Sequence, residues 1–514
     1  MIADALRDGL AVWPVVIPMG AAALSALLHR RPSLQRGVME AAVGLTLFAA
    51  LMLLVRASRG EILVVEFGGW GAPFGVTFVA DMVSAALSAA AGVIALAVAI
   101  FARADVRDRR RRAGFDPLFL GMVAAVNGAF LTGDIFNLYV WFELMLVTAI
   151  GLMTLDRRRA QIDGALRYAA MSMMGATFIL LGIALLYGET GTLDMAHLSA
   201  TLAGRTPSVA LTTSAYLLLA GLVLKAGLFP LFFWLPASYH TAPIGVAAAL
   251  AGLLTKVAFY ACLRVMVVVF GVGTGASPVP GLPALLALLA AATMLVSVLA
   301  AIGQVDVRRL LAFHVVGQVA YLVMGLALAS SLGAAAAIFY TVHTMLVQTG
   351  LFLGAGAIGR AGRGYDLRVV GGLLREHPLF SALFAVLALS ISGIPPLSGF
   401  WAKALVIDAA FRADVPWSGW LAVVALLTGF LTLYSMSTVW SQAFWRPRRG
   451  NERATRRIPP AMVVAVGLLA VCTVGLGLAI EPAVRLSRDA ARQLTSATAP
   501  GVPTTSARLT RGAP

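Results

Sequence analysis

Long apolar stretches alternate with short polar loops from Leu10 to Ile480. A helix needs about 20 apolar residues to cross a hydrocarbon core about 30 Å thick, and stretches of that length recur along nearly the whole chain. The predicted fold class is therefore an all-α polytopic membrane protein. We predict fourteen membrane-spanning helices, near residues 10–28, 38–55, 76–101, 117–133, 135–155, 168–187, 209–236, 243–270, 282–303, 310–329, 333–358, 378–411, 418–443 and 459–480.

The composition excludes several classes of protein. Of the 514 residues, 60% are hydrophobic and only 12% are charged, whereas a soluble domain carries about 25% charged residues. This excludes a soluble enzyme, a disulfide-stapled module and a DNA-binding domain, and the predicted loops are too short for a catalytic domain. Cys262 and Cys472 form no CxxC motif, and the chain has no HExxH or phosphate-binding loop. We therefore predict no cofactor and no metal site.

The net charge of +16 is distributed unevenly between the loops. The loops after predicted spans 1, 3, 5, 9, 11 and 13 hold 25 of the 39 Lys and Arg. Because basic loops face the cytoplasm, we predict a multi-pass protein of a bacterial inner membrane with both termini on the outer side. The same argument gives no nucleic-acid partner. The polar segment 481–514, rich in Ser, Thr, Pro and Gly from Ala497 onward, is predicted to be disordered.

The chain contains only three lysines, and all three fall within predicted spans: Lys225, Lys256 and Lys403. Elsewhere the sequence uses arginine, although the two residues cost similar free energies at a helix centre, about 2.5–3.5 kcal/mol. The two differ in that a guanidinium stays charged in proteins, whereas a desolvated ammonium can lose its proton. The choice of lysine favours a role in proton transfer, with charge-paired structural lysines as the alternative.

Glu143 is the one acidic residue predicted to lie deep within a span, about 12 Å into the fifth helix at a rise of 1.5 Å per residue. Asp81, Glu40 and Asp408 lie nearer helix ends, where we expect them at the membrane interface. A carboxylate at the depth of Glu143 needs a partner or a proton. Lys225 is the natural partner, because both residues are predicted near mid-membrane on helices 5 and 7.

Predicted spans 7 and 12 contain prolines that interrupt a helix. Pro230 and Pro236 follow the lysine of span 7, and Pro395 and Pro396 precede the lysine of span 12. Proline removes a backbone donor and leaves free carbonyls that neighbouring groups or water must satisfy. Interrupted helices beside ionisable groups, in corresponding places of two halves, are typical of ion sites in inverted-repeat transporters.

The spacing of the ionisable residues fits two inverted five-helix repeats. Glu143 precedes Lys225 by 82 residues, and His314 precedes Lys403 by 89. The predicted organisation is N-terminal helices 1–3 in residues 1–116, a first repeat of helices 4–8 in 117–270, a second repeat of helices 9–13 in 271–443, a loop and helix 14 in 444–480, and the polar tail in 481–514.

Polar residues in the apolar helices suggest how protons pass between the lysines, although a single histidine there is more often a hydrogen-bonded packing residue. The predicted proton relay consists of Glu143, Lys225, Lys256, His314 and Lys403. Further relay candidates are His240, Gln318 and His343. The sequence alone does not show which of these groups meet in space.

Four segments, in this order, resemble a known family: FNLYVWFELMLV (136–147), LVLKAGLFPLFFWLPASYHTAPIGVAAALAGLLTKVAFY (222–260), RRLLAFHVVGQVAYLVMG (308–325) and SGIPPLSGFWAK (392–403). They are similar to the antiporter-like subunits of Mrp-type multisubunit cation/proton antiporters and of the membrane arm of respiratory complex I, and most similar to the Mrp D subunit. The resemblance covers about spans 3 to 14. It implies fourteen helices, inverted repeats over helices 4–8 and 9–13, and broken helices 7 and 12.

The resemblance also implies roles for individual residues. Glu143 matches the family's helix-5 glutamate, and Lys225 matches the helix-7 lysine paired with it. Lys256 matches the helix-8 lysine, Lys403 matches the helix-12 lysine, and His314 lies where the family has a helix-10 histidine.

The implied function is that of a proton-translocating subunit of a monovalent cation (Na⁺ or K⁺)/proton antiporter, a secondary transporter and not an enzyme. Its implied partners are other subunits of a hetero-oligomeric complex, the lipid bilayer, protons and the cation. One departure is Gln348, which stands where many D-type sequences have a lysine and leaves open whether helix 11 titrates. The alternatives are a proton-pumping subunit of complex I, related to its L, M and N subunits, or of a membrane-bound hydrogenase, and a structural scaffold whose charges are silent.

Overall fold

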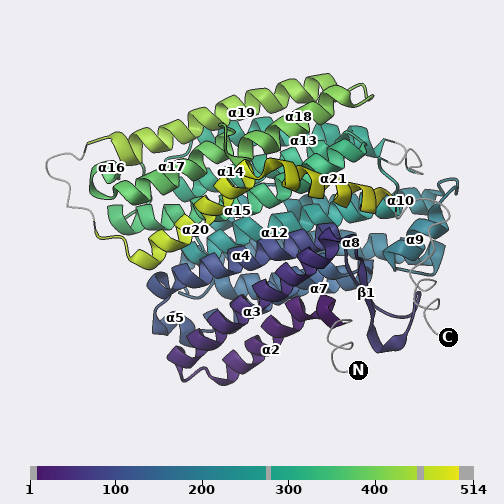
Figure 1. The fold of residues 1–514 in the computed structure, drawn as a ribbon, viewed down its shortest axis with the longest axis horizontal. Helices are drawn as coiled ribbons and strands as arrows, with labels where there is room; N and C mark the ends of the chain where they lie inside the picture. The colour runs from purple at the N-terminus through teal and green to yellow at the C-terminus, as the bar shows by residue number, and fades with distance from the viewer. Residues whose placement is uncertain (1–8, 274–278, 280, 448–455, 497–514) are drawn as a thin grey trace.

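The computed structural model describes residues 9–273, 279, 281–447 and 456–496. In this part of the chain, twelve helices are long and apolar enough to cross a membrane, and Phe115–Leu131 and Pro378–Ser392 form shorter apolar helices. Each predicted span overlaps one of these segments. Figure 1 shows the long helices lying side by side along the longest axis of the molecule. The prediction of an all-α polytopic membrane fold is confirmed.

The chain begins with helices that pack beside the repeats and with a small hairpin. In order, the elements are the short 3-10 turn η1 (Gly9–Val12), α2 (Trp13–Leu27), α3 (Pro32–Ser58), β1 (Leu63–Glu66), the turn η2 (Phe67–Gly69), β2 (Thr77–Ala80), α4 (Met82–Asp105) and α5 (Asp108–Arg112). Strands β1 and β2 pair antiparallel, with Leu63 opposite Ala80. The third span was predicted to begin near residue 76, but α4 begins at Met82 because Asp81 caps the helix by accepting from the Ser84 N–H at 3.0 Å.

The two predicted repeats have matching elements. The first contains α6 (Phe115–Leu131), α7 (Ile135–Met153), α8 (Arg159–Thr190), α9 (Met195–Leu202), α10 (Val209–Ala226), α11 (Trp234–Tyr239) and α12 (Ile244–Arg264), continued by the π-helical turn η3 (Val265–Val269). The second contains α13 (Leu282–Ile302), α14 (Val307–Ala327), α15 (Ser331–Gly362), α16 (Leu373–Glu376), α17 (Pro378–Ser392), α18 (Ser398–Arg412) and α19 (Ser418–Trp440), continued by the π-helical turn η4 (Ser441–Trp445). Helices α20 (Pro460–Leu478) and α21 (Ile480–Ser496) follow.

A pair of short backbone bridges marks corresponding points of the two repeats. Asp134 bridges to Asp194, and Asp306 bridges to Asp366, so that the two aspartates of each pair are 60 residues apart. Asp134 and Asp306 are the N-caps of α7 and α14. Helix α12 is buried along its whole length and α14 is buried from Leu310 onward, and they form the middle of the bundle together with α15.

The break in the seventh span lies between α10 and α11, as the sequence predicted. Helix α10 ends at Ala226, its C-cap Gly227 adopts the left-handed backbone with φ 75°, and Pro230 lies within the break. The Phe229 N–H donates to Thr293 Oγ1 of α13 at 2.9 Å. This satisfies one of the backbone groups that the break leaves free. Pro236 was also predicted to break the helix, but it lies in the first turn of α11, where a missing N–H costs no helical hydrogen bond.

The break in the twelfth span separates α17 from α18, with Pro395 and Pro396 between them. It packs closely against α20. A methyl group added at Gly477 would lie 2.4 Å from the carbonyl oxygen of Pro396 and 2.8 Å from the Ser398 nitrogen. Because both atoms belong to the backbone, only glycine fits there.

The prediction of disorder after the last span is wrong for residues 481–496, which belong to α21. The apolar side of this helix, which includes Ala490, Ala491 and Leu494, is buried. The low mean hydropathy of the segment hid a helical period of apolar residues. Residues 497–514 lie outside the described part of the chain.

Candidate proton-transfer site

The three lysines are buried on three different helices. Lys225 on α10, Lys256 on α12 and Lys403 on α18 are 8%, 0% and 7% exposed, respectively. Within the described part of the chain, the ion pairs all join an arginine to an aspartate or a glutamate, and none includes a lysine. The lysines are therefore held by neutral groups.

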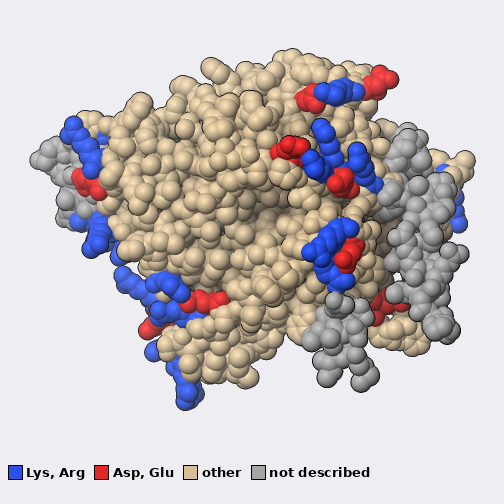
Figure 2. Space-filling model, in the orientation of Figure 1, with Lys and Arg blue, Asp and Glu red and all other residues tan. Residues whose placement is uncertain are grey.

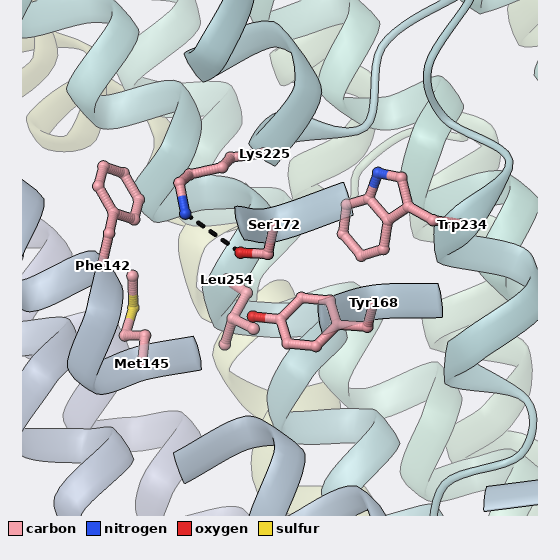
Figure 3. A pocket seen from close by; sticks show the side chains of 7 residues that line it. All are labelled: Phe142, Met145, Tyr168, Ser172, Lys225, Trp234 and Leu254. Atoms are coloured by element: carbon pink, nitrogen blue, oxygen red, sulfur yellow. Dashed lines mark hydrogen bonds between the residues drawn. The ribbon is translucent and has the colours of Figure 1, made fainter. Parts of the chain in front are cut away.

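The Lys225 amine faces a small cavity between α7, α8 and α10. Its Nζ donates to Ser172 Oγ at 3.1 Å and lies 5.0 Å from the centre of the Phe142 ring. The cavity has a volume of about 20 Å³, enough for one water molecule. Figure 3 shows the residues that line it: Phe142, Met145, Tyr168, Ser172, Lys225, Trp234 and Leu254. Leu254 lies on the helix that carries Lys256.

The predicted direct pair between Glu143 and Lys225 is not formed among the described residues. Glu143 follows Phe142 on α7, and its Oε1 is buried without a hydrogen-bond partner in the described structure. Phe136, Val140 and Val147 lie on the same side of α7 and are exposed. The carboxylate thus sits at the edge of an outward-facing apolar stripe, beside the residue whose ring touches Lys225.

Lys256 lies at a junction of three buried helices. Its Nζ donates to the Ala251 carbonyl at 2.7 Å and to Gln348 Oε1 of α15. Gln348 Nε2 in turn donates to the backbone carbonyl of His314 on α14 at 3.4 Å. The glutamine that departs from the family pattern therefore connects two residues of the predicted relay.

Lys403 is held by the break that precedes it. Its Nζ donates to the Ser392 carbonyl at 2.9 Å, one of the carbonyls that the end of α17 leaves free. The amine also lies 5.5 Å from the centre of the Tyr321 ring. Tyr321 stacks on Tyr340 with 5.2 Å between ring centres. Lys403 therefore borders a cluster of buried aromatic and polar groups.

The predicted histidines and Gln318 have hydroxyl or carbonyl partners. His314 Nε2 lies 2.9 Å from Ser435 Oγ, and Gln318 Oε1 accepts from Tyr340 OH at 2.8 Å. His343 Nδ1 lies 2.8 Å from Ser398 Oγ at the start of α18. His343 and Gln318 thus both contact the groups around Lys403.

His240 lies away from this cluster, between α11 and α12. Its Nδ1 lies 2.7 Å from the Pro236 carbonyl. Burial lowers the pKa of His240, and the hydrogen bond to Pro236 partly opposes that shift. Hydrogen bonds therefore connect Lys256, Gln348 and His314, and Gln318 and His343 contact groups around Lys403. In the described part of the chain, His240 contacts neither set.

Arg264 shows how a structural charge is held in the same fold. Its Nη2 pairs with Asp81 Oδ2 at 2.5 Å, and its Nε donates to Tyr260 OH at 2.9 Å. Asp81 is 5% exposed and lies at the N-terminal end of α4. A buried arginine in this chain has a carboxylate partner, whereas the buried lysines do not.

Sequence reasoning missed the hydroxyl groups of the site. The hydroxyl groups of Ser172, Ser398 and Ser435 contact the lysines or histidines. Serine in an apolar helix most often bonds to its own backbone one turn earlier, so its presence alone gives no signal. Their roles depend on which helix faces which.

Asp134, at the end of the bundle, makes the stability of the fold depend on pH. Its carboxylate caps α7 by accepting from the Asn137 N–H at 2.7 Å. In the other repeat, Arg308 pairs with Asp306 at 2.7 Å, whereas Asp134 has no ion pair among the described residues. Burial, together with the charge of Asp194, raises the pKa of Asp134 to about 6.

Because the folded protein holds this proton more tightly than the unfolded chain, the stabilisation is complete below about pH 4 and is lost as the pH rises to about 6. We expect Asp134→Asn to remove this loss, which amounts to about 1–3 kcal/mol. Thermal unfolding of the purified assembly between pH 4 and pH 7 measures it. The difference in melting temperature between Asp134→Asn and wild type should grow in favour of the variant as the pH rises. A difference that stays constant with pH would contradict the raised pKa of Asp134. Asp306→Asn, which breaks the pair with Arg308, is the matched control and should lower stability at neutral pH.

Comparison with known proteins connects this geometry to a family. The model of the family described as NADH:quinone oxidoreductase/Mrp antiporter, TM, matches residues 132–432. The chain belongs to this family. The matched residues include both broken helices and all three lysines.

The similarity to individual members of the NADH:quinone oxidoreductase/Mrp antiporter family extends over nearly the whole chain. The D subunit of the Na(+)/H(+) antiporter of Alkalihalophilus pseudofirmus is 37% identical over 95% of this chain and 97% of its own. A chain of the Mrp complex from Dietzia sp. DQ12-45-1b superposes with a TM-score of 0.89 at 31% identity, covering 95% and 98% of the two chains. A chain of respiratory complex I from Thermus thermophilus superposes with a TM-score of 0.74 at 27% identity, covering 92% and 99%.

Proposed function

We propose that this chain is the D-type subunit of a multisubunit monovalent cation (Na⁺ or K⁺)/proton antiporter and that it moves protons through the membrane. It acts as a secondary transporter subunit, not as an enzyme. The relatives that are named as D subunits of Na(+)/H(+) antiporters support this function, as does the likeness to the Mrp complex. Its partners are the other subunits of that assembly.

The observation that carries the proposal is the contrast between the buried arginine and the buried lysines. Arg264 keeps its charge beside Asp81, whereas the lysine amines contact a serine hydroxyl, a glutamine amide and backbone carbonyls. A desolvated amine without a carboxylate partner is free to alternate between its charged and neutral forms. These neutral acceptors stabilise an ammonium less than a carboxylate partner does, and burial opposes its charge.

The contacts support a route in two connected parts. The cavity beside Lys225 has room for a water between Ser172 and the helix of Lys256, and Lys256 is connected to His314 through Gln348. On the other side, Lys403 adjoins Tyr321. We propose that Glu143 switches Lys225 between its charged and neutral forms. The buried Oε1 of Glu143 has no hydrogen-bond partner among the described residues, and Glu143 follows Phe142, whose ring lies against the Lys225 amine.

We also propose that the protein lies in a bacterial inner membrane with both termini on the outer side, in keeping with the basic loops. Figure 2 supports helices that cross the membrane, because most charged residues on this face lie in two groups on either side of a broad uncharged band. The proposed organisation keeps the repeats at 117–270 and 271–443, preceded by helices 1–3 in residues 1–116.

The alternative function is that of a proton-pumping subunit in a redox-driven membrane complex. The likeness to complex I favours it, because the same fold serves there. The two functions differ in what accompanies the chain. An antiporter assembly purifies without redox subunits and couples proton flux to a Na⁺ or K⁺ gradient, whereas a redox pump requires quinone reduction.

Cation-driven proton flux in everted membrane vesicles containing the whole assembly tests the proposal. Glu143→Gln keeps the size of the side chain but cannot carry a charge or exchange a proton, so we expect exchange to fall by at least about tenfold. Glu40→Gln, which removes a surface partner of Arg103, is the matched control and should leave exchange unchanged. If Glu143→Gln assembles in normal amount and exchanges at the wild-type rate, the proposed switch is wrong.

A further inference from the structure

A groove of about 460 Å³ lies between α18 and α21. One wall is apolar and is formed by Trp401, Leu405, Ile480 and Val484. The Trp401 Nε1 atom is buried and has no hydrogen-bond partner in the described structure. The groove therefore combines a surface suited to hydrocarbon with an unused hydrogen-bond donor.

The rim of the groove is basic. Arg485, Arg488 and Arg492 line it, together with Glu481 and Asp489. Arg485 pairs with Glu481 at 2.6 Å, and Arg492 pairs with Asp489 at 3.2 Å. Arg488 has no ion pair among the described residues, so the rim carries one uncompensated positive charge.

The groove lies where a membrane-spanning helix ends. Only Ala479 separates α20, which is long and apolar enough to cross the membrane, from α21. In Figure 2, the charged residues over α21 stand at the edge of the uncharged band. An apolar wall that continues into basic residues at this level matches an amphiphile whose hydrocarbon lies in the membrane and whose charge lies at its surface.

We propose that this groove binds one anionic phospholipid, with an acyl chain against Trp401 and Val484 and the phosphate beside Arg488. A soluble anion would use the arginines but leave the apolar wall in contact with water. A zwitterionic lipid would fill the wall, but the quaternary ammonium of its headgroup would oppose the attraction between its phosphate and Arg488. The volume of the groove fits part of a lipid, since pockets for ligands of drug size span about 300–1,000 Å³.

The binding site lies between two helices that both pack against α15. Helix α18 follows the break and carries Lys403, and α21 packs against α4 as well. A lipid in the groove contacts α18 through Trp401 and α21 through Val484 and Arg488. It therefore fastens the outer half of the broken span to the last helix.

Native mass spectrometry of the intact purified assembly tests the proposal. The probes are dioleoyl phosphatidylglycerol and dioleoyl phosphatidylcholine, which share their acyl chains and differ in net charge. We expect the wild-type assembly to bind phosphatidylglycerol more tightly than phosphatidylcholine. Arg488→Gln should weaken the binding of phosphatidylglycerol about fivefold, as expected for the loss of one arginine near a charged headgroup, and leave phosphatidylcholine unaffected.

Two further variants separate the charge from the apolar wall. Val484→Asn should weaken both lipids, because it places an amide against the acyl chain. Arg205→Gln, an exposed arginine in the loop after α9, should change neither. The mass of the assembly reports whether each variant is complete.

Three outcomes would overturn the proposal. Equal binding of the two lipids would show that the arginines do not select charge. Displacement of phosphatidylglycerol by inorganic phosphate alone would show a site for soluble anions. Efficient cross-linking of a Val484→Cys variant to another subunit, with no lipid lost from Arg488→Gln, would show that a protein segment covers the groove.

Discussion

Replacing Lys225 by methionine is expected to reduce cation/proton exchange about a hundredfold, because it removes a proton-carrying group and leaves a side chain of similar length. Lys225→Arg is the more decisive variant. Arginine keeps the positive charge and can still donate to Ser172, but it does not release its proton in proteins. If the lysine titrates, Lys225→Arg fails as completely as Lys225→Met. The measurement is proton flux driven by a Na⁺ or K⁺ gradient in vesicles that contain the whole assembly.

The control exchanges the same two residue types in the opposite direction, at the buried arginine that pairs with a carboxylate. Arg264→Lys keeps a cation beside Asp81, where a permanent charge suffices, so exchange should stay within about twofold of wild type. The amount of assembled complex is measured for each variant. Retention of exchange by Lys225→Arg would show that the amine serves only as a charge, and the proposed relay would then lose its central group.

Much of the fold was predictable from the sequence because hydropathy and proline act locally. Apolar length placed the spans, and the prolines near residues 230 and 395 placed both breaks. The hairpin of β1 and β2 was missed because both strands are short and β2 merges with an apolar span. Helix α21 was missed because its apolar residues are few and only their period reveals them.

For the site, the sequence predicts only how deep each residue lies in the membrane. Sequence position gives the distance of Glu143 or Lys225 along a helix axis, but each residue turns the side chain by about 100° around that axis. Which groups meet depends on the rotation and packing of neighbouring helices. Lys225 therefore contacts Ser172 of α8 instead of Glu143 of α7. The same uncertainty hid the contact of Lys256 with Gln348.

Gln348 is an uncharged residue that connects Lys256 of α12 to His314 of α14 in the middle of the bundle. An amide offers one acceptor and two donors, so Gln348 can accept from Lys256 while donating to the His314 carbonyl. A carboxylate at this position would attract the ammonium, and a second ammonium would repel it. The amide does neither, which leaves Lys256 free to change its charge.

Gln348→Glu is accordingly expected to inhibit exchange strongly near neutral pH. A carboxylate beside the Lys256 amine in this buried setting holds the amine charged, and such a pair moves proton release by about one to three pH units. We expect the pH at which exchange is half-maximal to rise by that amount. Because the substitution changes only an amide to a carboxylate of the same shape, packing around α12, α14 and α15 should be preserved.

Gln348→Leu separates this electrostatic effect from the loss of the hydrogen bond. It removes the acceptor for Lys256 without adding charge, so exchange should slow while the half-maximal pH shows no alkaline displacement. Thr344→Val on the same helix, where the hydroxyl bonds only to the backbone carbonyl of Thr341, is the matched control and should leave the pH profile unchanged. If Gln348→Glu assembles normally and keeps the wild-type profile, Lys256 does not exchange protons, because a neighbouring carboxylate would otherwise alter that exchange.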